Sequence, residues 1–222
     1  SCQNKPIASQ VNITNTIFNT LFSGGERITI ESSANLPEIL LNTEPTPLKN
    51  FYHDFSFINR RQKFGSLLSF LLAQSTPQDG LLSDEPFHHF GSIDCNDDLC
   101  THCGACLTEC RIEALTTESE TLSLDHLAIL CVQCKFCVDV CPENALTMKP
   151  GLLLAPGFVT QRELTRAEPI SCLQCGKPFG TKKSYDRIVA ILESQNSNVM
   201  ENSVLEYCET CRVVKIFEAQ QQ

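Results

Sequence analysis

The stretch "CTHCGACLTEC" occupies residues 100–110, and "CVQCKFCVDVC" occupies residues 131–141. Each stretch carries four cysteines, separated by two, two and three residues. An offset of 31 residues superimposes the cysteines and continues through three further identities: Ala114 and Ala145, Leu115 and Leu146, and Thr116 and Thr147. Agreement at one offset indicates an internal duplication, so the two halves should fold alike.

Cysteine usage is the dominant feature of the composition. The chain has 14 cysteines; ten lie in Cys-x-x-Cys arrangements, and Cys110 and Cys141 each follow such a run after three residues. An even number of cysteines also suits a disulfide framework, but tight clusters of thiols favour metal binding. Zinc sites and buried thiols are alternatives for the duplicated runs, and the in-register repetition of four cysteines argues against both.

The duplicated runs resemble those of the bacterial-type 2[4Fe-4S] ferredoxins, in which the fourth cysteine of each run binds the other cluster. The resemblance covers roughly residues 92–150. It implies these ligands: Cys100, Cys103, Cys106 and Cys141 for a first [4Fe-4S] cluster, and Cys131, Cys134, Cys137 and Cys110 for a second. It further implies one-electron chemistry and a dicluster domain over 91–152, with two short hairpins and two short helices.

Two of the differences between the copies introduce a cation near the clusters. Arg111 stands where the second copy has Pro142, and Lys135 stands where the first copy has Gly104. We expect Arg111 to leave ligation intact and at most to make the two reduction potentials unequal, because nearby positive charge favours the reduced cluster. An Arg111 side chain directed to solvent is the simpler alternative.

A third group of cysteines lies near the end of the chain, in "CLQCGKPF" (172–179) and "CETCR" (208–212). Two such knuckles predict a tetrahedral Zn²⁺ site. Its ligands would be Cys172, Cys175, Cys208 and Cys211. A further iron–sulfur cluster, or thiols that bind no metal or form a redox disulfide, are the alternatives. We expect a small module over 168–215, with a helix at 184–195 between the knuckles.

Residues 1–90 contain one cysteine, Cys2, and no catalytic signature. We expect an N-terminal, partly helical extension and a candidate docking region. Patterns of apolar residues predict a strand at 27–30 and helices at 36–42 and 57–74. The last of these is either a docking contact or an ordinary core helix. A proline- and glycine-spaced stretch, "KPGLLLAPGF" (149–158), predicts a connector.

Charge and hydropathy narrow the function classes. The formal net charge of −9 disfavours a nucleic-acid partner, because phosphates would be repelled. No apolar run reaches the roughly 18–20 residues of a membrane span. The first residues lack the basic-then-apolar pattern of a secretory signal, and iron–sulfur assembly favours the cytoplasm, so a cytoplasmic protein is expected.

The fold class expected overall is α+β: a dicluster ferredoxin domain, a four-cysteine module and an N-terminal extension. Over about 92–215 this order resembles 4Fe-4S proteins associated with molybdenum enzymes, formate dehydrogenases especially. The resemblance implies an electron-transfer protein, or an oxidoreductase subunit, with a redox partner protein. A maturation or regulatory factor for an oxidoreductase is the alternative. A zinc enzyme is disfavoured, because a catalytic zinc keeps an open position.

Overall fold

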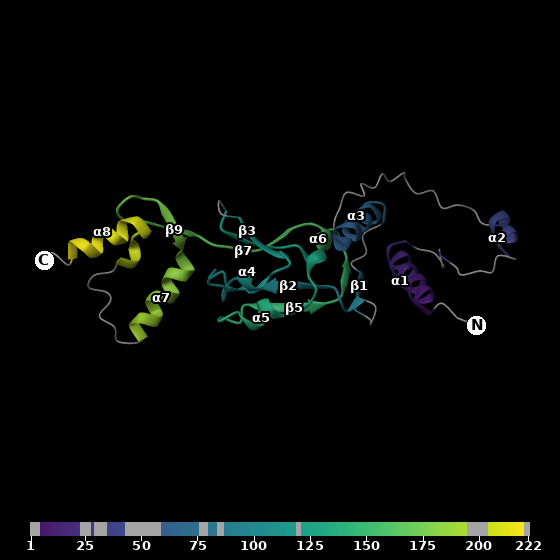
Figure 1. Cartoon of the computed structure of the whole chain (residues 1–222), viewed down its shortest axis with the longest axis horizontal. Coiled ribbons are helices and arrows are strands. Elements are labelled where there is room, and N and C mark those ends of the chain that lie inside the picture. Colours follow the sequence, from purple (N-terminus) through teal and green to yellow (C-terminus); the bar gives the residue numbers. More distant parts are fainter. Residues whose placement is uncertain are drawn as a thin grey trace. The chain divides into compact units, whose positions relative to one another are not determined.

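The computed structural model describes residues 5–22, 28, 35–42, 59–75, 80–83, 87–118, 121–194 and 204–219. These residues form a mixture of helices and strands (Figure 1), which confirms the predicted α+β character. Two compact units are present: one contains 1–91, 128–133 and 150–160, and the other contains 92–127, 134–149 and 161–222. Within the described ranges, no helix combines the length and hydrophobicity that crossing a membrane requires.

Three α-helices come from the N-terminal part of the first unit: α1 (Lys5–Leu21), α2 (Leu36–Asn42) and α3 (Arg60–Leu72). The helix predicted at 36–42 is confirmed, and the one predicted at 57–74 is found as α3. Asn59 begins α3, since its side chain accepts a hydrogen bond from the backbone N–H of Arg61 at 2.8 Å. The strand predicted at 27–30 lies, except for Ile28, outside the described residues.

Helix α3 belongs to the apolar core of the first unit. Its buried residues are Gly65, Leu68 and Leu72. It packs on the short 3-10 helix η2 (Ala128–Leu130) and on α6 (Pro156–Val159). A Cβ atom added at Gly65 would lie 3.1 Å from Cγ1 of Ile129, so a larger residue here would require the Ile129 side chain to shift. The core-helix interpretation of this segment therefore describes α3.

The segment predicted as a connector at 149–158 is instead structured. Strand β6 (Leu152–Leu154) pairs antiparallel with β1 (Gly80–Leu82), and α6 follows it. Leu152, Leu154 and Phe158 are almost fully buried. Burying such a side chain contributes roughly 1.5–3 kcal/mol, which outweighs the turn-forming tendency of the neighbouring prolines and glycines.

The second unit contains the first cysteine stretch, residues 134–141 of the second stretch and two pairs of strands. Strand β2 (Gly91–Cys95) pairs with β5 (Leu146–Pro150), and β3 (Leu115–Glu118) pairs antiparallel with β4 (Ser123–His126). The short helices α4 (Ala105–Glu109) and α5 (Phe136–Asp139) lie inside the two cysteine stretches. The core that these elements share consists of Ile93, Leu115, Leu124, Cys137 and Leu146.

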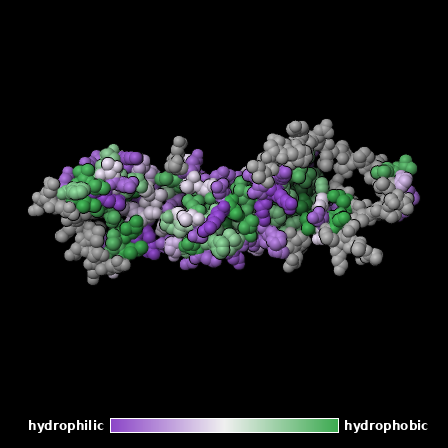
Figure 2. Space-filling view, viewed as in Figure 1, coloured by the Kyte–Doolittle hydropathy of each residue, from purple (hydrophilic) through white to green (hydrophobic). Residues whose placement is uncertain are grey.

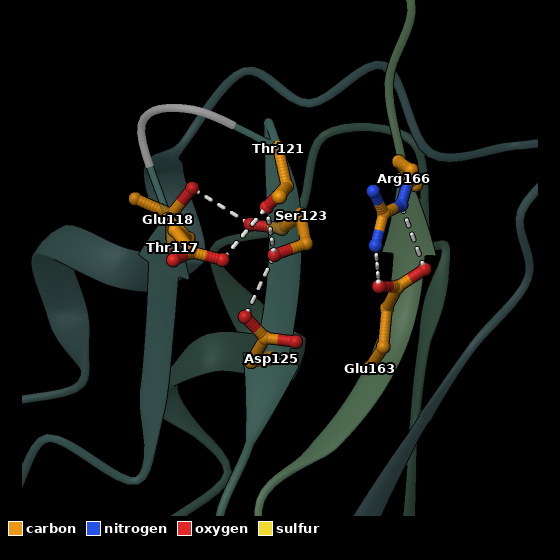
Figure 3. A network of polar contacts seen from close by, with 7 residues as sticks. All are labelled: Thr117, Glu118, Thr121, Ser123, Asp125, Glu163 and Arg166. Atoms are coloured by element: carbon orange, nitrogen blue, oxygen red, sulfur yellow. Dashed lines mark hydrogen bonds and ion pairs between the residues drawn. The ribbon is translucent and has the colours of Figure 1, made fainter.

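A third strand extends the β3–β4 hairpin. Strand β7 (Arg162–Arg166) pairs antiparallel with β4, which makes a three-stranded sheet in the order β3-β4-β7. Figure 3 shows the polar network of this sheet. The buried Ser123 hydroxyl donates to Asp125 Oδ2 at 2.7 Å, and Thr117 Oγ1 donates to the carbonyl oxygen of Ser123, also at 2.7 Å. These bonds satisfy buried polar groups and fix the hairpin.

The C-terminal part of the second unit carries the last four cysteines. Strands β8 (Pro169–Ser171) and β9 (Pro178–Thr181) form an antiparallel hairpin, and α7 (Lys182–Ser194) follows directly. The helix predicted at 184–195 is thus found at 182–194. The 3-10 helix η4 (Val204–Glu206) and α8 (Glu209–Ala219) complete the described part. Figure 2 shows hydrophobic and hydrophilic residues interspersed over α7 and α8.

Candidate metal centres

The internal duplication is conformational as well as sequential. Within each cysteine stretch, and again just after it, the backbone takes positive φ values at positions 31 residues apart. The pairs are His102 (55°) and Gln133 (59°), Gly104 (78°) and Lys135 (65°), and Glu113 (55°) and Asn144 (50°). Backbone that alternates between right- and left-handed conformations turns successive N–H groups into one concavity, an arrangement common at iron–sulfur sites.

Two long-range hydrogen bonds repeat with the same offset. The backbone N–H of Asn96 donates to the carbonyl oxygen of Ala145 at 2.8 Å, and that of Leu127 donates to Ala114, also at 2.8 Å. Each bond reaches from a residue that precedes one cysteine stretch to the residue just before the strand that follows the other. The two halves are therefore tied together reciprocally, as the exchange of fourth ligands in a dicluster domain requires.

The ligand set inferred for the first cluster lines a single cavity. This cavity has a volume of about 210 Å³. Four of its lining residues are Cys100, Cys103, Cys106 and Cys141. Three come from the first cysteine stretch, and the fourth is the last cysteine of the second stretch. Four thiols around one cavity are a donor set that suits a [4Fe-4S] cluster.

A further cysteine contacts this set. The Cys95 thiol hydrogen-bonds Cys100, and this bond, helped by the backbone N–H of His102, lowers the pKa of Cys100 to about 6 despite partial burial. Burial, together with the neighbouring thiols, raises the pKa of Cys106 to about 11. The sequence placed Cys95 outside the motif, and its spacing of five residues from Cys100 gave no sign of this contact.

Of the cysteines inferred for the second cluster, Cys110, Cys134 and Cys137 belong to the second unit. Cys110 and Cys137 pack on the same apolar core as Cys106 and Cys141 of the first set. Cys134 is exposed. Cys131 is buried in the segment 128–133, which belongs to the first unit.

Arg61 of α3 holds the segment that carries Cys131. Its Nη1 atom donates to the carbonyl oxygen of Cys131 at 2.9 Å and to that of Ile129 at 3.2 Å, and its Nη2 atom donates to His89 at 2.8 Å. The guanidinium also lies 4.6 Å from the centroid of the Phe90 ring. Sequence reasoning missed this residue, because one arginine in an amphipathic helix carries no local signal of such a role.

The last four cysteines form a compact group. The Sγ atoms of Cys172, Cys175, Cys208 and Cys211 all lie within 4.8 Å of one another, and Cys175 and Cys208 are 3.7 Å apart. A tetrahedral zinc with Zn–S bonds of 2.3 Å would separate its sulfurs by about 3.8 Å. The four thiolates of a cubane bind four different irons and lie further apart. The donor set therefore fits a single ion.

The knuckle around Cys172 is shaped by backbone hydrogen bonds. The N–H of Cys172 donates to the oxygen of Lys177, and the N–H of Gly176 donates back to Cys172, both at 2.9 Å. Gly176 takes a left-handed φ of 72°, which closes the turn. Burial opposes ionisation of Cys172, but N–H groups of Cys208, Cys175 and Gln174 point at its sulfur and lower its pKa to about 6.

Comparison with protein families supports an iron–sulfur assignment. A family model described as a 4Fe-4S dicluster domain matches residues 130–178, which include the second cysteine stretch and the knuckle of Cys172 and Cys175. The chain therefore contains a 4Fe-4S ferredoxin-type domain, with a four-cysteine group near its C-terminal end. A search of curated proteins found no match. Neither comparison links the chain to a formate dehydrogenase.

Proposed function

We propose that this chain is an electron-transfer protein or subunit that passes single electrons through two [4Fe-4S] clusters. The observation that carries the proposal is that four cysteines from both stretches line one cavity. The left-handed backbone positions that recur 31 residues apart support an equivalent second site. We assign Cys100, Cys103, Cys106 and Cys141 to the first cluster. We assign Cys131, Cys134, Cys137 and Cys110 to the second.

When bound, each cluster would supply reversible one-electron redox chemistry. The residues of the chain hold the clusters and set their potentials. The backbone N–H groups of Leu115 and Ala145 donate to the sulfurs of Cys110 and Cys141 at 3.3 Å, and such bonds stabilise negative charge and so favour reduction. Cys106 and Cys141 of the first set share an apolar core with Cys110 and Cys137 of the second. A shared core keeps these four thiols close together, which favours a short electron path between the two clusters.

The four-cysteine group would hold one Zn²⁺ in a structural role. Two observations support zinc over a third cluster. The sulfurs lie within a short distance of one another, and each Cys-x-x-Cys motif contributes one buried cysteine, Cys172 or Cys208, to the group. Four protein thiolates complete a tetrahedral coordination, so this site has no position for a substrate. The module would therefore stabilise the fold rather than catalyse a reaction.

The electron donor or acceptor would be a partner oxidoreductase. The order of the dicluster stretches and the four-cysteine module favours a molybdenum-dependent enzyme, of which formate dehydrogenase is the example that this order resembles. The net charge of −9 favours a partner with a basic docking surface.

Metal analysis and redox titration test the proposal. Chain purified without oxygen should contain about eight iron atoms and one zinc atom. Electron paramagnetic resonance (EPR) should show two signals that a low-potential reductant generates and an oxidant removes. Full loading without reversible cycling would favour the maturation or regulatory alternative. About twelve iron atoms without zinc would overturn the assignment of the four-cysteine group.

A further inference from the structure

The first turn of α7 lies against the loop that begins the first cysteine stretch. Lys183 Nζ donates to the carbonyl oxygen of Asp97 at 2.6 Å and lies 3.1 Å from its carboxylate Oδ1. Ser184 Oγ donates to the carbonyl oxygen of Thr101, and Thr181 Oγ1 donates to the same oxygen at 3.4 Å. Asp97 and Thr101 lie on either side of Cys100, so these contacts brace the loop around the first ligand.

One turn further along α7, Arg187 contacts the other chain segment that supplies a ligand to the cavity. Its Nε atom donates to Glu143 Oε1 at 2.7 Å. Glu143 follows Cys141 by two residues and lines the same cavity, as does Thr181. Lys183 and Arg187 are four residues apart and so lie on one face of the helix. This face spans both segments that bring cysteines to the first cavity.

The four-cysteine group anchors this turn of α7. Strand β9 ends at Thr181 and continues into α7 without a loop, and Thr181 is paired with Pro169 across the hairpin that contains the Cys172 knuckle. The Lys182 N–H donates to the oxygen of Glu168 at 2.8 Å. Tyr185 Oη donates to Glu206 at 3.3 Å, two residues before Cys208. Both halves of the cysteine group therefore connect to the first turn of α7.

We propose that Lys183 and Arg187 are positioning residues for the first cluster, and that metal in the four-cysteine group holds them in place. This inference rests on the proposed two-cluster function. Removing either cation takes away the positive charge that compensates an acidic side chain, Asp97 or Glu143, beside the first cavity. Uncompensated negative charge disfavours the reduced cluster, so the first potential falls while the second is unchanged.

The test is an EPR-monitored redox titration of the full chain. Signals are first assigned with Cys103→Ser and Cys134→Ser, each of which alters one cluster. Lys183→Gln and Arg187→Gln should each lower the potential of the cluster that Cys103→Ser alters by up to about 59 mV, a tenfold change in its one-electron equilibrium. Lys182→Gln is the matched control, since this neighbouring lysine is 62% exposed and lies 3.9 Å from Glu168; it should change neither potential.

A second measurement tests the role of the four-cysteine group. Cys175→Ser should remove its metal and accelerate iron release from the first cluster to a chelator, with the second cluster less affected. Equal effects on both clusters, or no effect of Lys183→Gln and Arg187→Gln, would overturn the inference. Arg187→Lys should restore the potential that Arg187→Gln loses, which separates a charge effect from misfolding. Wild-type chain without iron would instead refute the proposed function itself.

Discussion

Gly104 and Lys135 occupy equivalent positions in the two cysteine stretches, with left-handed φ values of 78° and 65°. Glycine adopts this conformation freely, whereas an L side chain is disfavoured there by roughly 1–2 kcal/mol. The second loop therefore stores strain that the first does not. Lys135 begins α5 and lies between Cys134 and Cys137, so the strain is located within the ligands assigned to the second cluster.

Replacing Lys135 with glycine should relieve this strain. We expect Lys135→Gly to stabilise the loaded protein by about 1 kcal/mol and to slow iron loss from the second cluster. The measurement is guanidinium unfolding without oxygen, followed by cluster absorbance. Gly104→Ala is the reverse experiment. A Cβ atom there meets no atom of the described residues within 4 Å, so its cost, also about 1 kcal/mol, comes from the backbone conformation. Destabilisation by both substitutions would contradict the account.

Arg61 should stabilise the segment that carries Cys131. Arg61→Met removes three hydrogen bonds to carbonyl oxygens and should cost about 2 kcal/mol locally. Hydrogen exchange read by mass spectrometry should show faster exchange of the Cys131 amide, which is bonded to Ala128 in the native structure. Arg60→Met is the control, because Arg60 is exposed on the same helix. Equal exchange rates of the Cys131 amide in the two variants would show that Arg61 does not stabilise this segment.

If the fourth ligands are exchanged, cysteine variants from different stretches should alter the same EPR signal. Cys141→Ser should alter the same EPR signal as Cys103→Ser, although Cys141 belongs to the other stretch, because both line one cavity. Cys110→Ser should alter the same signal as Cys134→Ser. Spectra of the four variants, each loaded without oxygen, make the comparison. If Cys141→Ser instead altered the same signal as Cys134→Ser, each stretch would hold its own cluster.

His126 should make stability sensitive to acid. The side chain is 1% exposed, and its Nε2 atom finds no hydrogen-bond partner among the described residues. Burial, and then the nearby charge of Arg162, lower its pKa to about 4. The native state thus resists a proton that the unfolded chain binds near pH 6.5, so stability falls as the pH drops from 6.5 towards 4, by about 3 kcal/mol at the limit.

His126→Leu should remove this part of the acid sensitivity. The measurement is the free energy of unfolding of wild-type and variant chain between pH 7 and pH 5, where the wild type should lose about 2 kcal/mol more than the variant. Identical slopes in the two proteins would show that His126 does not couple folding to pH.

Several elements could be predicted because their signals are local. Helices α2 and α7 were found close to their predicted bounds, since apolar spacing marks them. Helix α1 was missed: it is rich in asparagine and threonine, which have low helix propensity. Its apolar residues Val11, Phe18 and Leu21, spaced by seven and three, follow a helical period that could have revealed it. The run 149–158 was predicted as a connector because its prolines and glycines outweighed three consecutive leucines.

The amino-acid sequence alone establishes the duplication, the spacing of the cysteines and the division of the thiols into two runs and a separate four-cysteine group. These properties are patterns of residue identity and spacing along the chain, so they are visible without knowledge of the fold. Three features are visible only in the folded chain: Arg61 binds the Cys131 segment, β7 extends the β3–β4 sheet, and Lys183 and Arg187 contact Asp97 and Glu143 beside the first cavity. Such contacts join residues about 40 to 90 positions apart, and long-range pairs leave no periodic pattern, because chain folding rather than local spacing brings them together.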